Sequence, residues 1–465
     1  MGNNTLEKEA KELVRLRKAA SALKPAYYLG MIMVVLTIIY IVDEVTSNIN
    51  SAMQPYIIFD LFKISSRDVN STEYKESLNY VASWNLLSNL FLIIAPFYKA
   101  LSDRYGRRLF LMINTIGMGL GMLVVMISTS VLQYIIGMLF MLFFTPNDMQ
   151  VLYIMETAPK EKRATYSFVA KGIALISVSS IGVLSKVFLN DGVSSSWKYV
   201  YAIPVVVALV VGILSVVFVK ETPVFLEQRI FYLSLTEEEK ERRRQTEKEN
   251  NTSSQGGVFN AVKFIFSNKQ LRWILIAGFL FFATTFYTSY YATVLEGAMT
   301  TQMVSLALLI YPFCNGIVTI LSGLFSDKLG RKRVCLLLGT IALGGLLIFV
   351  LACRLGWGPI TAGVAYGCSI GGLWSMSDTL ILTMPAESSP SSMRSSVMGT
   401  ISVLIGAGMF IGQIAFIIGQ KFIPIDVLFL VICVPFMALS LIILMTKVKE
   451  TKFVNLDQVT VDKFK

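Results

Sequence analysis

Five ionisable side chains stand inside long apolar runs of the sequence, where a charge is costly and therefore informative. They are Asp43, Glu44, Asp148, Lys171 and Asp378. A charged group at the centre of a bilayer costs about 2.5–3.5 kcal/mol on insertion scales, so such residues normally face the interior of a helix bundle. We therefore expect these five to line an internal chamber, where they can bind a charged molecule or exchange a proton.

The adjacent acids Asp43 and Glu44 are candidates for proton exchange. A carboxyl in a poorly hydrated cavity resists ionisation, so it can bind and release a proton near neutral pH. The alternatives are an acid in contact with water at the outer end of its helix, or one that touches a bound molecule. The sequence does not say which of the two titrates.

Lys171 is the only basic residue that lies away from the ends of a predicted membrane span, eight residues after Arg163. Eight residues correspond to about 12 Å along a helix, which places the ammonium well inside the bilayer. The sequence predicts an ion pair with Asp148 or Asp43, or contact with an anionic group of a bound molecule. A third possibility is that the side chain extends back to the membrane surface.

Aromatic and polar residues supply further candidates for a binding site. Tyr287 and Tyr291 are spaced i, i+4 in a segment dense in aromatics, so one face of a helix can stack both rings on a bound molecule. Packing in the core or against lipid is the alternative. Asp378 lies in a Gly- and Ser-rich run that lets helices approach closely, and it is expected to line the chamber or carry a proton. Asn315, Trp374 and Gln413 complete the set.

The composition predicts that helices spanning a membrane position these residues. Of 465 residues, 54% are hydrophobic and only 15% are charged, and the mean hydropathy is +0.64. A span needs about 20 mostly apolar residues. About twelve such stretches can be found, at 27–48, 80–98, 109–127, 131–155, 165–189, 197–219, 271–295, 303–325, 334–353, 358–384, 395–419 and 422–446.

Several classes of function are not expected from this composition. There is no histidine, and the five cysteines lie in apolar runs without the spacing of metal ligands. No nucleophile stands with a base, and no Gly-rich loop ends in Gly-Lys-Ser/Thr. We therefore expect no enzyme, no metal, no cofactor and no ATP-driven pump.

The basic residues predict the orientation in the membrane. Of the 41 Lys and Arg residues, 33 fall on the tails and on the loops of one side, and the formal net charge is +11. Such residues collect on cytoplasmic loops, so this asymmetry explains the charge better than binding to nucleic acid does. Both termini are expected in the cytoplasm, with the chain crossing the cell (inner) membrane many times. A polar stretch at 220–270 separates two halves, 26–219 and 271–446, flanked by tails 1–25 and 447–465.

Two loop motifs occur twice in the same order. Ser102-Asp103-Arg104-Tyr105-Gly106-Arg107-Arg108 recurs as Ser326-Asp327-Lys328-Leu329-Gly330-Arg331-Lys332, and Glu156-x-x-Pro159-x-x-x-Arg163 recurs as Glu387-x-x-Pro390-x-x-x-Arg394. The nearly equal offsets indicate a duplicated six-helix unit, which places a substrate between the halves near the bilayer midplane. The glycine permits a tight turn, and the Asp can cap the helix that follows.

These motifs resemble those of the major facilitator superfamily, over nearly the whole chain. The Glu-x-x-Pro-x-x-x-Arg element, Lys220-Glu221-Thr222-Pro223, Glu450-Thr451-Lys452 and the pair Asn315-x-x-x-Thr319 look like the sugar-porter branch and its organic-ion relatives. The resemblance implies an all-α membrane protein of about twelve transmembrane helices in two pseudo-symmetric halves. It also implies a conformational latch that holds the outward-facing state, made by Asp103, Arg107, Glu156, Arg163, Asp327, Arg331, Glu387 and Arg394.

The sequence departs from that branch where sugars are bound. Its sugar porters carry amides in helix seven, at positions that here hold Leu280, Phe281, Thr284 and Phe286, and a glutamine in helix five, where Lys171 stands. The resemblance matches Asp43 or Glu44 to the proton-coupling acid of helix one, although the arginine that accompanies it in helix four is missing. Lys99 also replaces a glycine of the first loop motif.

The sequence therefore favours a secondary transporter that moves a small organic solute by alternating access, with a proton as the expected co-substrate. An organic ion or amphipathic carboxylate is favoured over a simple sugar. The alternatives are a sugar or polyol porter of the same fold and a non-transporting membrane sensor, which the short tails disfavour. The partners expected are the solute, the proton and the lipid bilayer, and the protein is expected to be a monomer.

Overall fold

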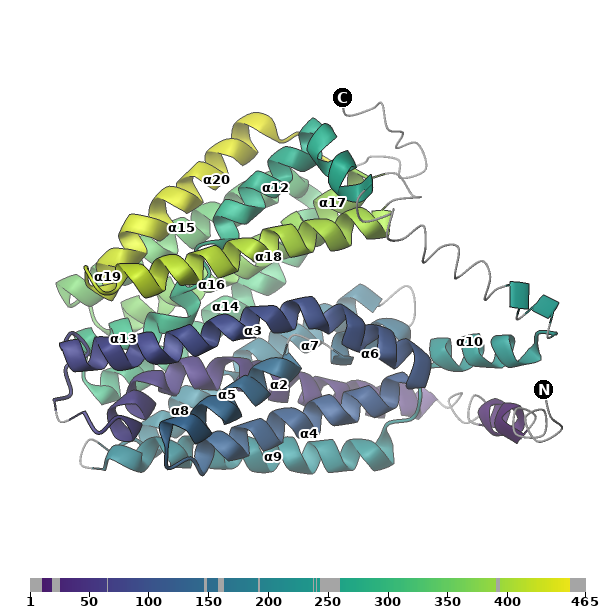
Figure 1. The fold of residues 1–465 in the computed structure, drawn as a ribbon, viewed down its shortest axis with the longest axis horizontal. Coiled ribbons are helices and arrows are strands. Elements are labelled where there is room, and N and C mark those ends of the chain that lie inside the picture. The colour runs from purple at the N-terminus through teal and green to yellow at the C-terminus, as the bar shows by residue number, and fades with distance from the viewer. Residues whose placement is uncertain are drawn as a thin grey trace.

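The chain folds into a bundle of long helices, with no strand in the part that the structure describes (Figure 1). The structure is a computed structural model. It describes residues 11–18, 26–64, 66–145, 149–157, 163–190, 193–236, 238–239, 241–242, 260–389 and 394–451.

The first half of the bundle is formed by helices that pack mainly on one another and lie together in the lower part of Figure 1. It contains α2 (Ala26–Leu61), α3 (Thr72–Tyr105), α4 (Arg107–Met126), α5 (Val131–Phe144), α6 (Met149–Thr157), α7 (Arg163–Ser177), α8 (Ser179–Phe188), the short η2 (Ser194–Ser196) and α9 (Trp197–Phe218). Helix α10 (Pro223–Ser234) follows and projects from one end of the bundle.

The second half repeats this arrangement. It contains α12 (Lys269–Phe282), α13 (Tyr287–Ala298), α14 (Thr301–Leu329), α15 (Arg331–Leu355), α16 (Pro359–Asp378), η3 (Thr379–Thr383), α17 (Met384–Glu387), α18 (Arg394–Gly419), α19 (Ile425–Leu428), η4 (Phe429–Cys433) and α20 (Val434–Lys447). The elements η3 and η4 are π-helical turns inside otherwise continuous helical segments. Such turns are frequent at functional sites, and η3 follows Asp378 directly.

Ten helical stretches of the described chain are long and apolar enough to cross a membrane. The expected number of about twelve is reached with α3, which carries charged residues in its first turns, and with α16, in which Gly and Ser lower the hydropathy. Both are long enough to span, since 20 residues of helix extend about 30 Å.

The two loop motifs lie at the same end of the bundle, which we call the motif end; it also carries α10. There α3 meets α4 at Gly106, and α14 meets α15 at Gly330. Both glycines have positive φ, 108° and 98°, a conformation that side chains bearing a Cβ rarely adopt. We call the opposite end, where α2 and α13 finish, the far end.

The halves are joined by hydrogen bonds near the far end. The Tyr56 hydroxyl donates to Glu296 (2.7 Å), the Tyr74 hydroxyl lies 3.1 Å from that of Thr293, and the Gln420 amide donates to Asn79 (2.9 Å). In Figure 1 the halves approach at this end, and their helices spread toward the end that carries α10.

Glycines set how closely the halves approach along α8 and α14. A Cβ added to Gly182 would overlap the backbone of Leu309 in the opposite half. We expect Gly182→Val to lower the free energy of unfolding by about 1–3 kcal/mol, because overpacking forces the helices apart. Thermal unfolding of the purified protein measures this effect.

Gly344→Val is the matched control, because a Cβ added at Gly344 meets nothing within 4 Å. It carries the same change in helix propensity without the clash. Equal melting temperatures for the two variants would show that close approach at Gly182 is not needed.

Candidate functional site

An ion pair links the two halves inside the bundle. The Lys171 ammonium, from α7, lies 3.2 Å from a carboxylate oxygen of Asp378, the last residue of α16. The side chain of Lys171 is 28% exposed and that of Asp378 is 57% exposed. Charges exposed to hydrocarbon are strongly disfavoured, so we expect this partly exposed pair to face the space between the halves.

This partner differs from the ones expected from sequence. Asp148 lies outside the described residues, and the carboxylate of Asp43, on α2, accepts a hydrogen bond from Gln150. The signal available in the sequence was weak: Asp378 and Lys171 are 207 positions apart, and only the packing of the halves brings them together.

Asp43 is buried in the first half and accepts a hydrogen bond from the side-chain amide of Gln150, on α6, at 2.8 Å. Gln150 lies in the fourth membrane segment, so this segment contacts the acid through an amide and not through an arginine. An amide can donate to a carboxylate and can also accept from a protonated carboxyl, so it suits both protonation states. Glu44, the adjacent acid, is half-buried and lies close enough to influence Tyr311 electrostatically.

Tyr287 and Tyr291 do not face an open space in this conformation. Both are fully buried, at 0% and 1% exposure. Tyr291 stacks on Tyr366 with ring centroids 4.2 Å apart, and the Tyr287 hydroxyl lies 2.8 Å from that of Ser369. The two rings that were expected to stack on a bound molecule thus pack on other aromatics of the second half.

The remaining candidates are distributed over the second half. Gln413 donates to the backbone carbonyl of Ala82 in the opposite half (3.4 Å) and to the Tyr290 hydroxyl, so it joins the halves. Asn315 is buried and accepts from Thr319 at 3.4 Å. Trp374 is half-buried, one helical turn before Asp378, and meets Phe282 edge to face.

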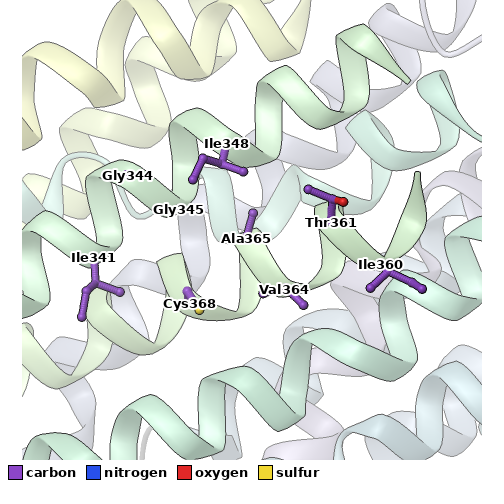
Figure 2. Close-up of a pocket in the computed structure, with 9 residues that line it drawn as sticks. All are labelled: Ile341, Gly344, Gly345, Ile348, Ile360, Thr361, Val364, Ala365 and Cys368. Atoms are coloured by element: carbon purple, nitrogen blue, oxygen red, sulfur yellow. The ribbon is translucent and has the colours of Figure 1, made fainter. Parts of the chain in front are cut away.

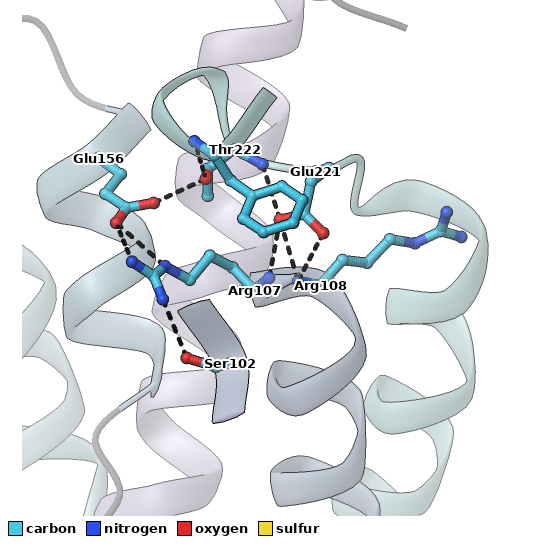
Figure 3. A network of polar contacts seen from close by, with 7 residues as sticks. Ser102, Arg107, Arg108, Glu156, Glu221 and Thr222 are labelled. Carbon is cyan, nitrogen blue, oxygen red and sulfur yellow. Dashed lines mark hydrogen bonds and ion pairs between the residues drawn. The ribbon is translucent and has the colours of Figure 1, made fainter. Parts of the chain in front are cut away.

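A polar network closes the motif end of the first half (Figure 3). The Arg107 guanidinium donates to Glu156 (2.9 and 3.0 Å) and to Ser102 (3.0 Å). Glu221 accepts from the backbone N–H groups of Arg107 and Arg108, the first residues of α4, and from that of Thr222 (2.9, 3.2 and 3.0 Å). The Thr222 hydroxyl donates to Glu156 (2.6 Å), which joins the two acids into one network.

The second half contains the same network. Arg331 donates to Glu387 (3.1 Å), and the Thr451 hydroxyl donates to the same carboxylate. Glu450 accepts from the backbone N–H groups of Arg331, Lys332 and Thr451 (2.8, 3.3 and 3.0 Å). In each half an acid just after the last membrane helix, α9 or α20, caps the N-terminus of the third membrane helix, α4 or α15. Free N–H groups at that terminus favour a negative charge.

The glycine turns make room for these acids. A Cβ at Gly106 would overlap the Glu221 carboxylate, and one at Gly330 would come within 2.6 Å of a Glu450 oxygen. The sequence predicts a cap from the Asp of each loop motif, but the side chains of Asp103 and Asp327 lie outside the described residues. The caps that the structure describes come from Glu221 and Glu450, which the sequence reasoning missed as site residues. The repeated Glu-Thr pair after the last helix of each half was the available signal.

Comparison with known proteins agrees with this duplicated architecture. The family profile described as the Major Facilitator Superfamily matches residues 29–413. The chain belongs to the major facilitator superfamily. It is therefore a secondary transporter of a small solute and a multi-pass membrane protein, not an enzyme, and the predicted all-α membrane fold is confirmed.

Solved structures of this superfamily match over most of the chain. A crystal structure of a D-xylose-proton symporter has a TM-score of 0.67 and 15% identity, covering 91% of this chain and 99% of that one. The xylose transporter XylE from E. coli in an inward open conformation gives 0.68 and 16%, covering 93% and 99%. A bacterial homolog of the human lysosomal transporter Spinster, inward-facing and unoccupied, gives 0.57 and 13%, covering 90% and 95%. No curated protein sequence matches significantly.

The latch residues whose side chains the structure describes are paired within one half of this major facilitator protein. Arg107 binds Glu156 and Arg331 binds Glu387, so each described pair ties helices of one half together. Asp103, Arg163, Asp327 and Arg394 lie in α3, α7, α14 and α18, but their side chains are outside the described residues. The described pairs can hold each half rigid whichever way the transporter faces.

The cap at Glu221 is expected to respond to pH. Burial raises the pKa of the Glu221 carboxyl above its ordinary value of 4.5, while the N–H groups of Thr222, Arg108 and Arg107 oppose the shift. The folded protein then binds this proton more tightly than the unfolded chain does. The stability that the proton contributes is fully present below pH 4.5 and is lost as the pH rises through the folded-state pKa.

Replacing Glu221 with Gln removes this titration. We expect the Gln variant to be less destabilised than the native protein as the pH rises from 4 to 7, by no more than about 1 kcal/mol, because solvent screens a half-buried group. Thermal unfolding across that pH range measures the slope. Glu239→Gln is a control of opposite sign, because hydrogen bonds from Thr236 lower the pKa of the exposed Glu239. Equal slopes for native protein and Glu221→Gln would contradict the assignment.

Proposed function

We propose that this transporter carries a small organic ion, with an amphipathic carboxylate favoured over a simple sugar, and couples its movement to the proton by symport. The observation that carries the proposal is the Lys171–Asp378 ion pair, which bridges the halves at an exposed position. Within a helix bundle a cation that loses its carboxylate partner has few replacements, so a bound anion can take the place of Asp378.

A substrate carboxylate can replace Asp378 as the partner of Lys171. The exchange keeps the ammonium paired while it releases the link between α7 and α16, so occupancy of the site becomes coupled to the relative movement of the halves. This gives an anionic substrate a differential affinity for the two states, which alternating access requires. Trp374, one turn from Asp378, offers an aromatic surface beside the charge.

The seventh membrane segment lacks the amide side chains that a hexose site needs. Several amide donors and acceptors at fixed points are needed to bind a hexose, but the corresponding positions of the seventh membrane segment hold Leu280, Phe281, Thr284 and Phe286. Phe281, Thr284 and Phe286 are buried, and the Thr284 hydroxyl donates to the Phe281 carbonyl. A sugar or polyol porter remains the second candidate, because the matching structures include proton:xylose symporters.

The setting that we propose follows from charge. The motif end carries most Lys and Arg residues, so it and both termini face the cytoplasm of the cell membrane. With the halves joined near the far end, the conformation described here is then inward-facing. We keep the boundaries 26–219 and 271–446 for the halves and 220–270 for the linker, and we propose that the protein acts as a monomer.

Two substitutions test the role of the ion pair. Lys171→Gln should weaken binding of organic carboxylates at least tenfold, since the only cation that we assign to them is lost. Asp378→Asn should preserve or strengthen that binding, because Lys171 loses its competing carboxylate. Both effects are measurable by ligand-induced thermal shift of the purified protein and by uptake into proteoliposomes. Tighter binding of sugars than of carboxylates, unaffected by Lys171→Gln, would favour the second candidate.

The proton-coupling role is tested at Asp43. Asp43→Asn keeps the shape and the contact with Gln150 but removes the titrating group. We expect it to abolish accumulation driven by a pH gradient and to retain exchange of substrate down its own gradient. Glu44→Gln is the matched control at the neighbouring acid and decides which of the two titrates. If neither variant loses gradient-driven accumulation, coupling through this pair is wrong.

A further inference from the structure

One face of α2 carries polar side chains along the middle of the helix. They recur at spacings that place them on a single face: Thr37, Tyr40, Glu44, Ser47, Asn48 and Ser51. Ser47 is exposed, while Glu44 and Asn48 are half-buried, so neighbouring helices cover this face only in part. Polar side chains in a membrane span normally face the interior of the bundle, and we therefore expect this face to line the space between the halves.

Contacts with the second half place this face at the boundary between the halves. The hydroxyl of Tyr311, on α14, donates to the side-chain oxygen of Asn48 at 3.4 Å. The hydroxyl of Tyr291, on α13, donates in turn to that of Tyr311, also at 3.4 Å. Glu44 stands one turn before Asn48 and lies close enough to Tyr311 to act on it electrostatically. Glu44, Asn48 and Tyr311 therefore form a cluster that joins the two halves, which we call the interhalf cluster.

The two adjacent acids of α2 are placed differently. Neighbouring residues of a helix point in directions about 100° apart. Asp43 is 5% exposed and accepts a hydrogen bond from Gln150 inside the first half. Glu44 belongs to the polar face that meets Tyr311. Of the two acids, Glu44 is therefore the one that a molecule between the halves can contact directly.

The hydrogen bonds of the interhalf cluster leave it rich in acceptors. The hydroxyl of Tyr311 donates to Asn48, and the side-chain amide of Asn48 donates to the backbone carbonyl of Glu44 at 2.8 Å. An ionised carboxylate only accepts, and an amide oxygen accepts two hydrogen bonds. An ammonium group supplies three donors and a positive charge, whereas a hydroxyl supplies one donor and no charge. The chemistry of the cluster therefore fits an ammonium group better than a hydroxyl.

The interhalf cluster lies beyond the level of Lys171 along the bundle. Helices α2 and α7 pack on one another. Ala170 and Ala174, which stand on either side of Lys171 in the sequence, belong to an apolar cluster whose α2 members end at Tyr40. Glu44 is one turn, about 6 Å, past Tyr40 toward the far end. A cation and an anion thus stand at successive levels of two helices that are in contact.

We propose that the interhalf cluster is a subsite for an ammonium group of the solute, and that the solute is a zwitterion whose carboxylate pairs with Lys171. The proposal rests on the proposed function, because it uses the same anion site. It adds the second charge that the solute carries. A solute with both charges brings an opposite charge to Lys171 and to Glu44 at once, which an organic carboxylate without an amine does not.

An apolar recess elsewhere in the second half is the competing location for a small organic ligand. It lies between α15 and α16 and has a cavity volume of about 520 Å³ (Figure 2). None of the residues that line it is charged, and Thr361 and Cys368 are its polar exceptions. Gly344 lines the recess, and a Cβ added there meets nothing within 4 Å. Gly344→Leu therefore fills the recess without a clash and serves as the control.

The experiment compares butyrate, 4-hydroxybutyrate and 4-aminobutyrate, with shorter and longer homologues of each, by thermal shift of the purified protein. At the best chain length, the amino carboxylate should bind roughly tenfold more tightly than the other two, because charge-assisted hydrogen bonds are stronger than neutral ones. Glu44→Gln should remove this advantage and leave binding of butyrate unchanged. Tyr311→Phe, which removes the donor that orients Asn48, should reduce the advantage by roughly threefold. Gly344→Leu should change the binding of none of these ligands.

The effect on the amine alone separates a binding role of Glu44 from a structural one, since a distorted protein would bind all three ligands less well. An equal advantage for the hydroxyl, or an amine advantage that survives Glu44→Gln, would overturn the proposal. Loss of the advantage in Gly344→Leu would place the ligand in the recess and would also overturn it. Unchanged binding of every carboxylate in Lys171→Gln would instead be a failure of the proposed function. The subsite is then judged with butylamine, whose binding Glu44→Gln should weaken and whose unchanged binding would refute it.

Discussion

A charge inside a membrane protein must have a partner, and this constraint organises the centre of the molecule. Lys171 and Asp378 satisfy it by pairing across the boundary between the two halves, so their ion pair also joins the halves. In the function that we propose, this link opens when a substrate anion takes the place of Asp378 beside Lys171. In this proposal, the specificity for charge and the movement of the halves depend on the same two side chains.

The halves can move as bodies because each is fastened internally. At the motif end, Glu221 and Glu450 cap the third helix of their halves, and the arginine–glutamate pairs beside them tie in the fourth and tenth membrane segments. The contacts of the arginine with its glutamate and of the capping acid with the helix N-terminus recur in both halves. A network that stays inside each half is compatible with either orientation of the transporter, and this explains why it is intact while the halves are separated at the same end.

Small residues set how closely the halves approach along the seam where α7 and α8 pack on α14. Gly172, Gly182 and Gly316 allow the backbones of facing helices to approach closely, and this seam is packed.

The sequence by itself determined the all-helical membrane class, the duplicated halves and the identity of the chemically informative residues. Hydropathy and the repeated motifs are local signals, and in a bilayer every backbone polar group must be satisfied within helices or closed barrels, which leaves few alternatives. Asp43 and Lys171 were recognisable because a charge in an apolar run is rare. Only the tertiary structure decided their partners. Helix packing brings Gln150 to Asp43 over 107 positions and Asp378 to Lys171 over 207 positions. Packing against neighbours such as Tyr366 likewise decides that Tyr287 and Tyr291 are buried. No pattern in a single helix encodes which face of another helix it will meet.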